Sequence, residues 1–369
     1  MQALILAGGE GTRLRPLTST VPKPVVPLVD RPFISFVLEW LRGHGVDDAI
    51  LSCGFMADGV RAVLGDGSAV GVRLRYVEEP EPLGTGGALK FAETLLDERF
   101  FMLNGDVLCD LDLTEQLSQH ERTGARATLA LVPVEDPSAY GLVRRNRDLS
   151  VREFVEKPSS QQIDTNLVNA GAYIIERELL AELAPAGTRI SIERDVFPTL
   201  VDRGLFGFEA SGYWLDIGTP ERYLQATFDI LNGNVRTEIG SRVREAGGVL
   251  CEGDATRVAG VVHAPALLGS GCALAADAIV GAETVLGRGV SVGAGARIDR
   301  SVLLDGVVVG AGTRISGSIV GPGVRIGDGC RIERGVVLGQ GVSVGAGNTL
   351  DAGIRIFPGV KLPDGAIAF

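Results

Sequence analysis

The residues best suited to chemistry lie in one loop near the start of the chain. Arg13, Arg15 and Lys23 place three positive charges within eleven residues of one another. Glycine lets a backbone approach a ligand closely, and successive backbone N–H groups form a concavity that suits anions. The uncharged members of this loop are Leu6, Ala7, Gly8, Gly9, Gly11 and Thr12. The loop therefore predicts a phosphate-binding site.

The flanking elements support that interpretation. A short apolar run at residues 3–7 predicts a buried strand, and apolar residues at helical spacing follow over 33–41. A strand that enters a glycine- and cation-rich loop suits phosphate binding. The loop is not a P-loop, because no Lys-Ser or Lys-Thr pair follows its glycines. It also lacks the third glycine of a dinucleotide fingerprint.

Two aspartates follow apolar runs that predict strands. Asp106 comes after residues 100–103, and Asp216 comes after residues 213–215. Carboxylate oxygens at strand ends can hold Mg²⁺, which commonly uses one or two carboxylates together with phosphate oxygens and water. The alternative for Asp106 is a turn residue that caps the next helix.

The chain divides into two parts of different composition. Residues 236–369 carry 28 of the 51 glycines. In the first part, strands expected at 49–53, 74–78, 100–103 and 127–132 alternate with helices at 58–64, 87–96 and 113–122. This alternation predicts an α/β, Rossmann-like, mostly parallel sheet with helices on both faces.

The second part has an aliphatic residue at every sixth position, with two steps of five. Disorder needs no such register, and a six-residue repeat is the signature of a β-helix. The pattern resembles the left-handed parallel β-helix of hexapeptide proteins, with three repeats per coil and five to six coils. The tail over 353–369 is expected to cap one end or to join a neighbouring subunit. The repeat positions are Val262, Leu268, Leu274, Val280, Leu286, Val292, Ile298, Leu303, Val309, Ile315, Val320, Ile326, Ile332, Leu338, Val344, Leu350 and Ile356.

The loop pattern, from Leu6 through Arg13 to the Lys23-Pro24 pair, resembles the signature of the sugar nucleotidyltransferases, or NDP-sugar pyrophosphorylases. The resemblance implies a catalytic domain over 1–234, a linker over 235–260 and a β-helix over 261–369. It implies a nucleoside triphosphate and a sugar 1-phosphate as substrates. Arg13, Lys23, Asp106 and Asp216 would be catalytic, and the two aspartates would hold Mg²⁺.

Further site residues follow from the same resemblance. The nucleotide-binding set would comprise the loop residues with Arg13 and Lys23, joined by a second loop that contains Gly84, Thr85 and Gly87. The sugar-phosphate set would comprise Gly141, Glu156, Lys157 and Asn169. Taken alone, these last positions are ordinary strand–turn junctions, and Ser191–Pro198 is expected to be structural.

Gly87 bears on the choice of nucleotide. Relatives that bind thymine or uracil usually carry Gln or His here, so a glycine removes that contact and leaves room for a purine. The run 212–218 resembles the mannose-1-phosphate guanylyltransferase branch, which implies GTP plus mannose 1-phosphate giving GDP-mannose and pyrophosphate. A heptose-1-phosphate guanylyltransferase or a glucose-1-phosphate thymidylyltransferase stays open.

Composition limits the other functions. A net charge of −11 and a pI near 4.9 argue against a nucleic-acid partner. Five scattered cysteines favour free thiols over zinc. No apolar run reaches membrane-spanning length, so a cytoplasmic protein with no membrane contact is expected. The β-helix is expected to form a homo-oligomer.

Two rival functions would require different residues. Acetyl transfer on a β-helix generally needs a histidine base, and His263 is the one histidine after residue 234. His44 and His120 are expected on helix surfaces. A regulatory subunit with a decayed site would be expected to lack at least one of Arg13, Lys23, Asp106 and Asp216, whereas all four are present.

Overall fold

The computed structural model describes residues 1–54, 56–253 and 256–367. These residues form two compact units. The first unit comprises residues 1–9 and 34–214, and the second comprises 10–33 and 215–369. Residues 254–255 of the expected linker and 368–369 of the expected tail lie outside the described residues.

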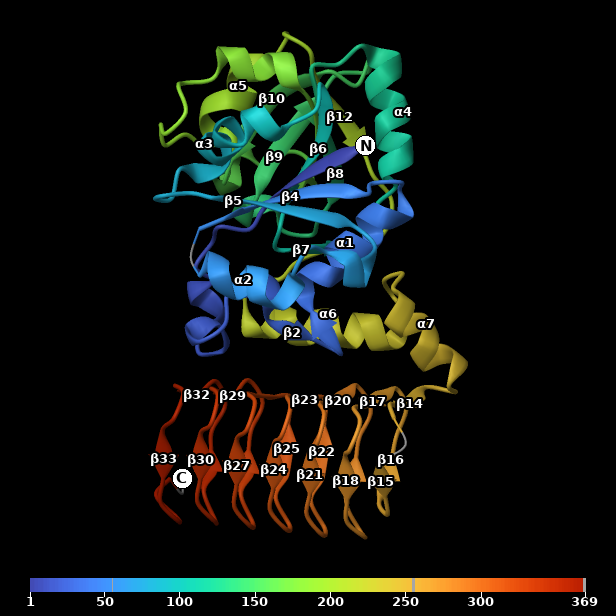
Figure 1. Cartoon of the computed structure of the whole chain (residues 1–369), viewed down its shortest axis with the longest axis vertical. Helices are drawn as coiled ribbons and strands as arrows, with labels where there is room; N and C mark the ends of the chain where they lie inside the picture. Colours follow the sequence, from blue (N-terminus) through green and yellow to red (C-terminus); the bar gives the residue numbers. More distant parts are fainter. Residues whose placement is uncertain (55, 254–255, 368–369) are drawn as a thin grey trace. The chain divides into compact units, whose positions relative to one another are not determined.

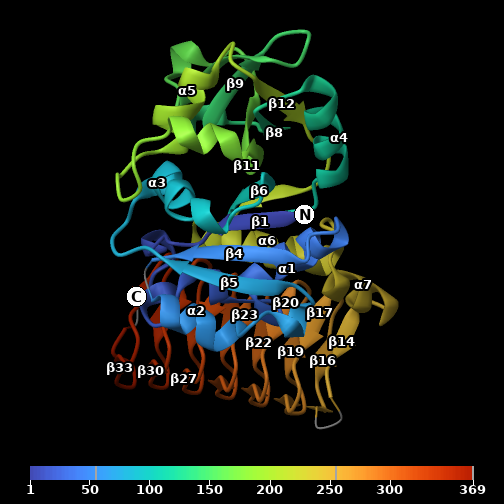
Figure 2. The ribbon, with the colours of Figure 1, turned by 45° about the horizontal axis from the view of Figure 1, so that its top comes forward.

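The first unit contains a mixed sheet with strand order β10-β9-β11-β6-β1-β4-β5, and β8 joins β11 to β12. Strands β6, β1, β4 and β5 run parallel, whereas β11 runs antiparallel to β6 and to β8 (Figure 2). The strands of this unit are β1 (Gln2–Leu6), β4 (Asp48–Cys53), β5 (Arg73–Glu78), β6 (Arg99–Asn104), β7 (Val107–Cys109), β8 (Ala127–Pro133), β9 (Gly141–Arg145), β10 (Val151–Glu156), β11 (Leu167–Glu176) and β12 (Leu205–Glu209). The α/β class and the alternation of strands with helices are therefore confirmed.

Helices cover this sheet. The central strands β1, β4, β6 and β8 are apolar at nearly every position because both faces are buried. On one face, Leu4, Ile50 and Phe100 pack with residues of α3 and α5. The helices of this region are α1 (Phe33–Gly43), α2 (Ala57–Leu64), α3 (Gly84–Phe91), α4 (Leu113–Thr123) and α5 (Phe197–Leu200).

One histidine expectation is wrong. His120 is 1% exposed, and its ring contacts Thr128 (Nδ1···Oγ1 2.8 Å) and Glu176 (Nε2···Oε1 3.0 Å). Burial lowers the pKa of His120, although the Glu176 carboxylate acts in the opposite direction. A polar residue at this position of α4 was expected at the surface. His120 can instead be buried, because partners on β8 and β11 satisfy its ring nitrogens.

The second unit begins with the cationic loop and short strands β2 (Pro27–Leu28) and β3 (Arg31–Pro32). Strand β13 (Trp214–Asp216) spans the boundary between units, and α6 (Pro220–Asn232) and α7 (Glu238–Glu245) follow. Thr219 caps α6 by accepting a hydrogen bond from the N–H of Arg222, and Pro220 occupies its first turn. Gly233 ends the helix in the left-handed conformation.

Three sheets of parallel strands build the rest of the second unit (Figure 1), and they fit the expected left-handed β-helix. The first sheet comprises β14 (Val249–Cys251), β17 (Ala266–Leu268), β20 (Thr284–Leu286), β23 (Val302–Leu303), β26 (Ile319–Val320), β29 (Val337–Leu338) and β32 (Arg355–Ile356). The second comprises β15 (Arg257–Val258), β18 (Ala273–Leu274), β21 (Ser291–Val292), β24 (Val308–Val309), β27 (Arg325–Ile326), β30 (Ser343–Val344) and β33 (Lys361–Leu362). The third comprises β16 (Val261–Val262), β19 (Ile279–Val280), β22 (Arg297–Asp299), β25 (Arg314–Ser316), β28 (Arg331–Ile332) and β31 (Thr349–Leu350).

The six-residue repeat points its aliphatic residues into the β-helix. From Leu268 to Ile356, every predicted repeat position is buried in one continuous core, and Val262 packs against it. The described strands make six complete coils, the upper end of the expected five to six, and two strands of a seventh. The first two strands of the first coil were placed in the expected linker, because Cys251, Val258 and Val262, which pair with Leu268, Leu274 and Val280, are separated by steps of seven and four residues.

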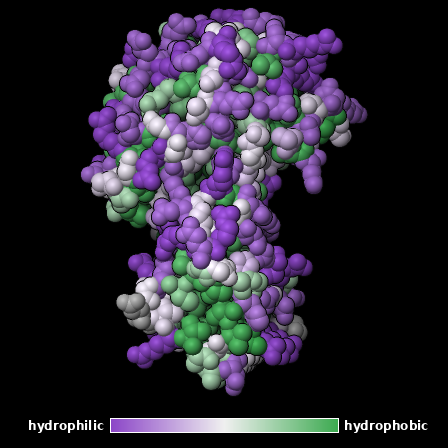
Figure 3. Space-filling model, turned by 90° about the vertical axis from the view of Figure 1, so that its right-hand side faces the viewer, coloured by the Kyte–Doolittle hydropathy of each residue, from purple (hydrophilic) through white to green (hydrophobic). Residues whose placement is uncertain are grey.

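Apolar side chains gather at the end of the β-helix formed by the first coil (Figure 3). Val258 and Val261 of this coil are 42% and 52% exposed. Among the described residues, no helix has the length and apolar character needed to cross a membrane. All five cysteines are free.

Candidate active site

The cationic loop of the second unit folds back on itself. It consists of three 3-10 turns, η1 (Thr12–Leu14), η2 (Leu17–Ser19) and η3 (Lys23–Val25). The Thr18 hydroxyl donates a 2.7 Å hydrogen bond to the carbonyl of Gly11. Gly11 has φ +63°, and a Cβ atom there would lie 3.0 Å from Cβ of Lys23. A glycine is therefore needed both for the conformation and for the close approach of η3.

Arg13 lies beside the start of α6. A Cβ atom built on Gly218 would be 2.7 Å from Nη2 of Arg13 and 3.2 Å from Oδ1 of Asp216. Asp216 also forms an ion pair with Arg222 (Nη1···Oδ2 3.7 Å). The second unit thus brings together two of the predicted catalytic residues, Arg13 and Asp216, with a glycine that leaves space for them.

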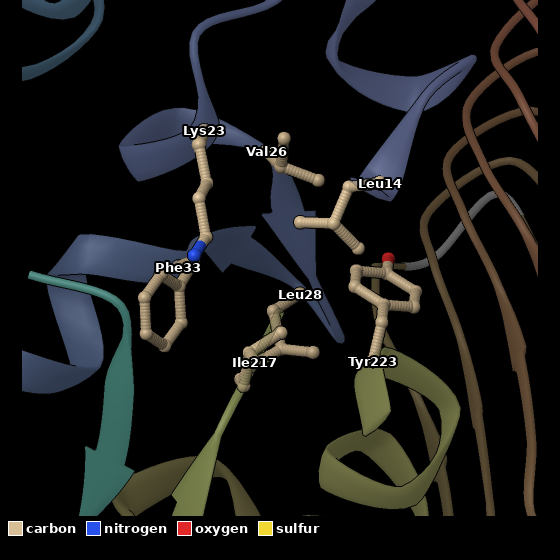
Figure 4. Close-up of a pocket in the computed structure, with 7 residues that line it drawn as sticks. All are labelled: Leu14, Lys23, Val26, Leu28, Phe33, Ile217 and Tyr223. Atoms are coloured by element: carbon tan, nitrogen blue, oxygen red, sulfur yellow. The ribbon is translucent and has the colours of Figure 1, made fainter. Parts of the chain in front are cut away.

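Lys23 lines a small pocket that is otherwise apolar and aromatic (Figure 4). Lys23 and Phe33 lie on one side, and Leu14 and Tyr223 lie on the other. Tyr223 is buried, and its hydroxyl donates a 2.5 Å hydrogen bond to the carbonyl of Pro27. The full lining is Leu14, Lys23, Val26, Leu28, Phe33, Ile217 and Tyr223. This packing fixes the stem of Lys23 against α6 and the segment that follows η3.

In the first unit, the glycine loop and Asp106 come from adjacent strands. Strand β1 lies between β4 and β6, with Leu6 opposite both Ser52 and Asn104. The N–H of Gly105 donates to the carbonyl of Leu6 (2.9 Å), and a Cβ atom on Gly105 would be 2.6 Å from that oxygen. Parallel strands end at one edge of a sheet, where ligands of such folds bind. Gly8 and Asp106 therefore share that edge.

Sequence reasoning missed Glu79. Its carboxylate accepts hydrogen bonds from the hydroxyl of Ser52 (2.9 Å) and from the N–H of Leu83 (3.1 Å). A Cβ atom on Gly8 would lie 3.3 Å from Oε1 of Glu79. Glu79 therefore ties the end of β4 and the start of α3 to the glycine loop. The available signal was an acidic residue directly after a predicted strand and before the second glycine run.

The second glycine run forms the first turn of α3 and packs on the segment 188–193. Thr85 donates through Oγ1 to Glu193 (2.6 Å) and accepts from the N–H of Ile192 (2.9 Å). A Cβ atom on Gly87 would lie 2.6 Å from the carbonyl oxygen of Thr188. In this conformation Gly87 faces packed backbone, so the argument that its missing side chain leaves room for a purine finds no support.

The expected sugar-phosphate residues lie on β9, β10 and β11 or directly after them. Gly141 pairs with Glu156, and a Cβ atom on Gly141 would be 3.2 Å from Oε2 of that glutamate. Burial raises the pKa of Glu156, the charge of Glu193 adds to this, and Lys157 opposes it. Asn169 donates from Nδ2 to the hydroxyl of Tyr173 (2.8 Å). Lys157 is exposed, with φ +53°.

Asn104 is a second residue that sequence reasoning did not single out. A Cβ atom on Gly171 would lie 2.7 Å from Nδ2 of Asn104, so the two strands meet closely at this point. The Oδ1 atom of Asn104 is buried and has no hydrogen-bond partner within the described ranges. Buried acceptors are usually satisfied. This atom is therefore suited to accept a hydrogen bond from a ligand at the edge that carries Asp106.

The donor chemistry of the two aspartates fits a magnesium ion. The described part of the chain has no group of three or more His, Cys, Asp or Glu side chains that could hold a metal. Asp106 belongs to the first unit and Asp216 to the second. Mg²⁺ often takes one or two carboxylates and completes its shell with substrate phosphates and water. Each aspartate supplies oxygen ligands of this kind.

Family models match both parts of the chain. Residues 2–233 match the nucleotidyl transferase family, and residues 262–362 match the GMPPB C-terminal domain. The first match covers more than half of the chain. Nucleotidyltransferases of this family generally use a divalent metal.

Several relatives are similar over long stretches. The mannose-1-phosphate guanylyltransferase of Mycobacterium tuberculosis is 37% identical over 317 residues, which is 83% of this chain and 80% of that protein. The mannose-1-phosphate guanylyltransferase catalytic subunit beta of Danio rerio is 39% identical over 256 residues, or 68% of this chain and 70% of that protein. HddC from Yersinia pseudotuberculosis, solved in complex with GMP-PN, is 31% identical with a TM-score of 0.53, covering 61% of this chain and 97% of that one.

Proposed function

Since the protein belongs to the nucleotidyl transferase family, we propose that it transfers the guanylyl group of GTP to mannose 1-phosphate, giving GDP-mannose and pyrophosphate. The main support for this proposal is that Arg13 lies beside Asp216. The loop that carries Arg13 also carries Lys23. The relatives named as mannose-1-phosphate guanylyltransferases support the choice of substrates.

The reaction is an in-line displacement at the α-phosphorus. A phosphate oxygen of the sugar 1-phosphate forms the new P–O bond, the bond to the bridging oxygen of the β-phosphate breaks, and pyrophosphate leaves with those electrons. The attacking oxygen is already ionised at neutral pH, so no side-chain base is required. Catalysis then consists largely of positioning and charge neutralisation.

The cationic loop supplies the neutralisation. Arg13 and the loop amides would hold the β- and γ-phosphates and offset the charge that develops on pyrophosphate. Lys23 would offset the charges of the α-phosphate and the incoming sugar phosphate. The remaining nucleotide contacts would come from the first loop (Leu6–Thr12) and from Gly84, Thr85 and Gly87.

A magnesium ion would be held by the carboxylates of Asp106 and Asp216. When bound, such an ion polarises phosphate oxygens and helps to orient them. On the sugar side, Glu156 would accept hydrogen bonds from sugar hydroxyls and Lys157 would meet the sugar phosphate. Asn169 and the backbone of Gly141 would complete that pocket.

Two other substrate pairs belong to the same reaction. A heptose-1-phosphate guanylyltransferase would use the same loop and the same guanine nucleotide, and the GMP-PN complex of a similar structure favours guanine over thymine. Glucose-1-phosphate thymidylyl transfer is less favoured, because a similar structure named for that activity, from Bacillus anthracis, is 26% identical to this chain, against 31% for the GMP-PN complex. A non-catalytic regulatory subunit would not need Arg13 and Asp216 to adjoin.

A homo-oligomer is part of the proposal. The exposed valines Val258 and Val261 lie at the end of the β-helix, where, among the described residues, each strand of the first coil has a sheet neighbour on one side only. Large exposed apolar patches and open strand edges favour association, so a second copy would cover this end. Light scattering after size-exclusion chromatography should show a smaller particle for Val261→Lys than for the wild type, and equal masses would refute this interface.

We also propose bounds for the domains and a cellular location for the protein. The matches at 2–233 and 262–362 support a catalytic domain over 1–234, a linker over 235–260 and a β-helix over 261–369, although 235–260 contains α7, β14 and β15. The free cysteines support a cytoplasmic location, where thiols stay reduced.

Pyrophosphate release tests the proposal. GTP, dTTP, UTP, ATP and CTP would each be paired with mannose 1-phosphate and with glucose 1-phosphate in the presence of Mg²⁺. Turnover confined to GTP with mannose 1-phosphate is the expected result. Preference for dTTP with glucose 1-phosphate would refute the substrate assignment and keep the reaction class. If folded protein released no pyrophosphate with any pair, catalysis with these substrates would be contradicted.

A further inference from the structure

The first sheet of the β-helix has a second apolar row, on its outward face. In β17, β20, β23, β26 and β29, one residue per strand points away from the β-helix core, and these residues are in register with one another. None of them is more than 1% exposed, so this outward face is buried. The row consists of Leu267, Val285, Val302, Ile319 and Val337.

The next position in this row is Arg355 of β32, which pairs with Val337. An aliphatic residue would continue the row, so an arginine breaks the local pattern. Departures from a local pattern without a packing gain are expected at functional or strained positions.

Arg355 reaches the cationic loop. Its Nη1 donates to the carbonyl oxygens of Arg13 (2.9 Å) and Arg15 (3.2 Å). Both carbonyls lie at the end of η1, where the backbone has no further helical partner. A charged donor makes a stronger hydrogen bond than a neutral one. A single guanidinium nitrogen therefore holds both ends of the backbone segment that carries Leu14.

We propose that Arg355 is a positioning residue for the phosphate loop: from the last described strand of the first sheet, it fixes the backbone of residues 13–15 and thereby the direction of the Arg13 side chain. The inference rests on the proposed function for its kinetic consequence. Its structural consequence, an ordered η1 turn, does not depend on which substrates the enzyme uses.

Arg355 is charged and exposed, so its contribution to packing is small. Arg355→Leu would restore the apolar row and should leave the melting temperature unchanged or raised. The same change removes both hydrogen bonds to η1. Loss of catalysis without loss of stability separates a positioning role from a merely structural one.

The experiment compares Arg355→Leu and Arg355→Lys with Arg325→Leu. Arg325 is an exposed arginine of the second sheet, in β27, and has no hydrogen bond or ion pair to the loop in the described part of the chain. We expect Arg355→Leu to lower kcat/KM for GTP by about tenfold, the scale of a lost charged hydrogen bond. The KM for mannose 1-phosphate should change little. Arg355→Lys should recover part of the loss, and Arg325→Leu should match the wild type.

Hydrogen exchange of the backbone amides of residues 11–15 gives a readout that needs no turnover. Faster exchange there in Arg355→Leu, and not in Arg325→Leu, is the expected result. Unchanged exchange, or a wild-type kcat/KM in Arg355→Leu, would overturn the inference. If the wild type fails in the substrate panel but the exchange result holds, the proposed function fails and the positioning contact stands.

Discussion

The guanidinium of Arg13 occupies the space that a side chain at position 218 would fill, because a Cβ atom on Gly218 would lie 2.7 Å from its Nη2 atom. The Oδ1 atom of Asp216 is 3.2 Å from the same point. A glycine at the start of α6 therefore permits two charged side chains to adjoin. The requirement is steric, since Gly218 is not among the residues with positive φ.

Gly218→Ala should displace Arg13 without unfolding the protein. The end of an arginine side chain moves easily, so we expect a near wild-type melting temperature and a fall in kcat/KM of about tenfold or more. Gly43→Ala is the matched control, because Gly43 has no positive φ and no atom would meet its Cβ within 4 Å. The measurement is the kcat/KM of both variants. A wild-type kcat/KM in Gly218→Ala would contradict a catalytic role for the position of Arg13.

Glu156 should give the sugar-phosphate KM an unusual dependence on pH. Burial, then the charge of Glu193, raises the pKa of Glu156 above its ordinary 4.5. Sugar hydroxyls need the ionised carboxylate as acceptor, so binding should weaken as pH falls through this raised pKa. The KM for mannose 1-phosphate, measured from pH 8 downward, should rise at a higher pH than an ordinary glutamate would cause.

The control is Glu156→Gln, whose side chain at position 156 cannot titrate. The sugar phosphate titrates in the same way with both proteins, so the difference between them reports on Glu156. The KM of Glu156→Gln for mannose 1-phosphate should be higher than that of the wild type at neutral pH. It should not show the further rise at lower pH that protonation of Glu156 causes. Because the folded pKa of Glu156 is raised, the folded state loses stability as pH rises through that window. Glu156→Gln should therefore melt higher than the wild type at neutral pH, and identical pH profiles for the two proteins would contradict the assignment.

Gly87→Ala should impair the enzyme without changing its choice of base. A Cβ atom there would overlap the carbonyl oxygen of Thr188 at 2.6 Å and Cβ of Leu83 at 2.8 Å. Overpacking of this kind costs about 1–3 kcal/mol, although alanine is normally the better helix former. We expect a lower melting temperature and equal proportional losses with GTP and UTP. A changed GTP/UTP ratio would instead show that position 87 reads the base.

A ladder of three arginines lies on the third sheet of the β-helix. Arg297, Arg314 and Arg331 are exposed and in register on consecutive strands. Like charges directly opposite one another destabilise a sheet, so Arg314→Thr should stabilise the protein by about 0.5 kcal/mol at low salt. The gain should shrink in 1 M salt, where charges are screened.

Arg325→Thr is the control for that change, because Arg325 lies between Val308 and Ser343 in the second sheet. It makes the same gain in strand propensity and relieves no repulsion. Chemical denaturation at low and high salt measures the difference. Equal effects of the two substitutions would show that the ladder carries no electrostatic cost.

Much of the fold could be predicted from the sequence because its periodicities reflect burial. Ile298, Ile315 and Ile332 follow the repeat because each fills one coil of the core. The alternating strands and helices of the first unit followed from short apolar runs such as residues 100–103. The first two strands of the first coil were not predicted, because Cys251 and Val258 do not keep the period. The burial of His120 was not predicted, because its hydrogen-bond partners come from other strands of the sheet.

The site was predictable where its residues form a local motif and not elsewhere. Arg13 and Lys23 belong to one loop, and their types indicate phosphate binding. Glu79 and Arg355 act through contacts between distant segments; Arg355 and Arg13 are 342 residues apart in sequence. No local pattern encodes such a contact. For Gly87, the sequence suggested open space, but the structure places packed backbone there.

The most direct test of the central claim follows the fate of each phosphate of GTP. With GTP labelled at the α-phosphate, the account predicts that the label enters a sugar nucleotide with mannose 1-phosphate. With GTP labelled at the γ-phosphate, the label should leave in pyrophosphate. Arg13→Ala and Lys23→Ala should slow both processes together by roughly 10³-fold. Transfer of the γ-label to the sugar phosphate, or no transfer of the α-label by folded wild-type protein, would contradict nucleotidyl transfer.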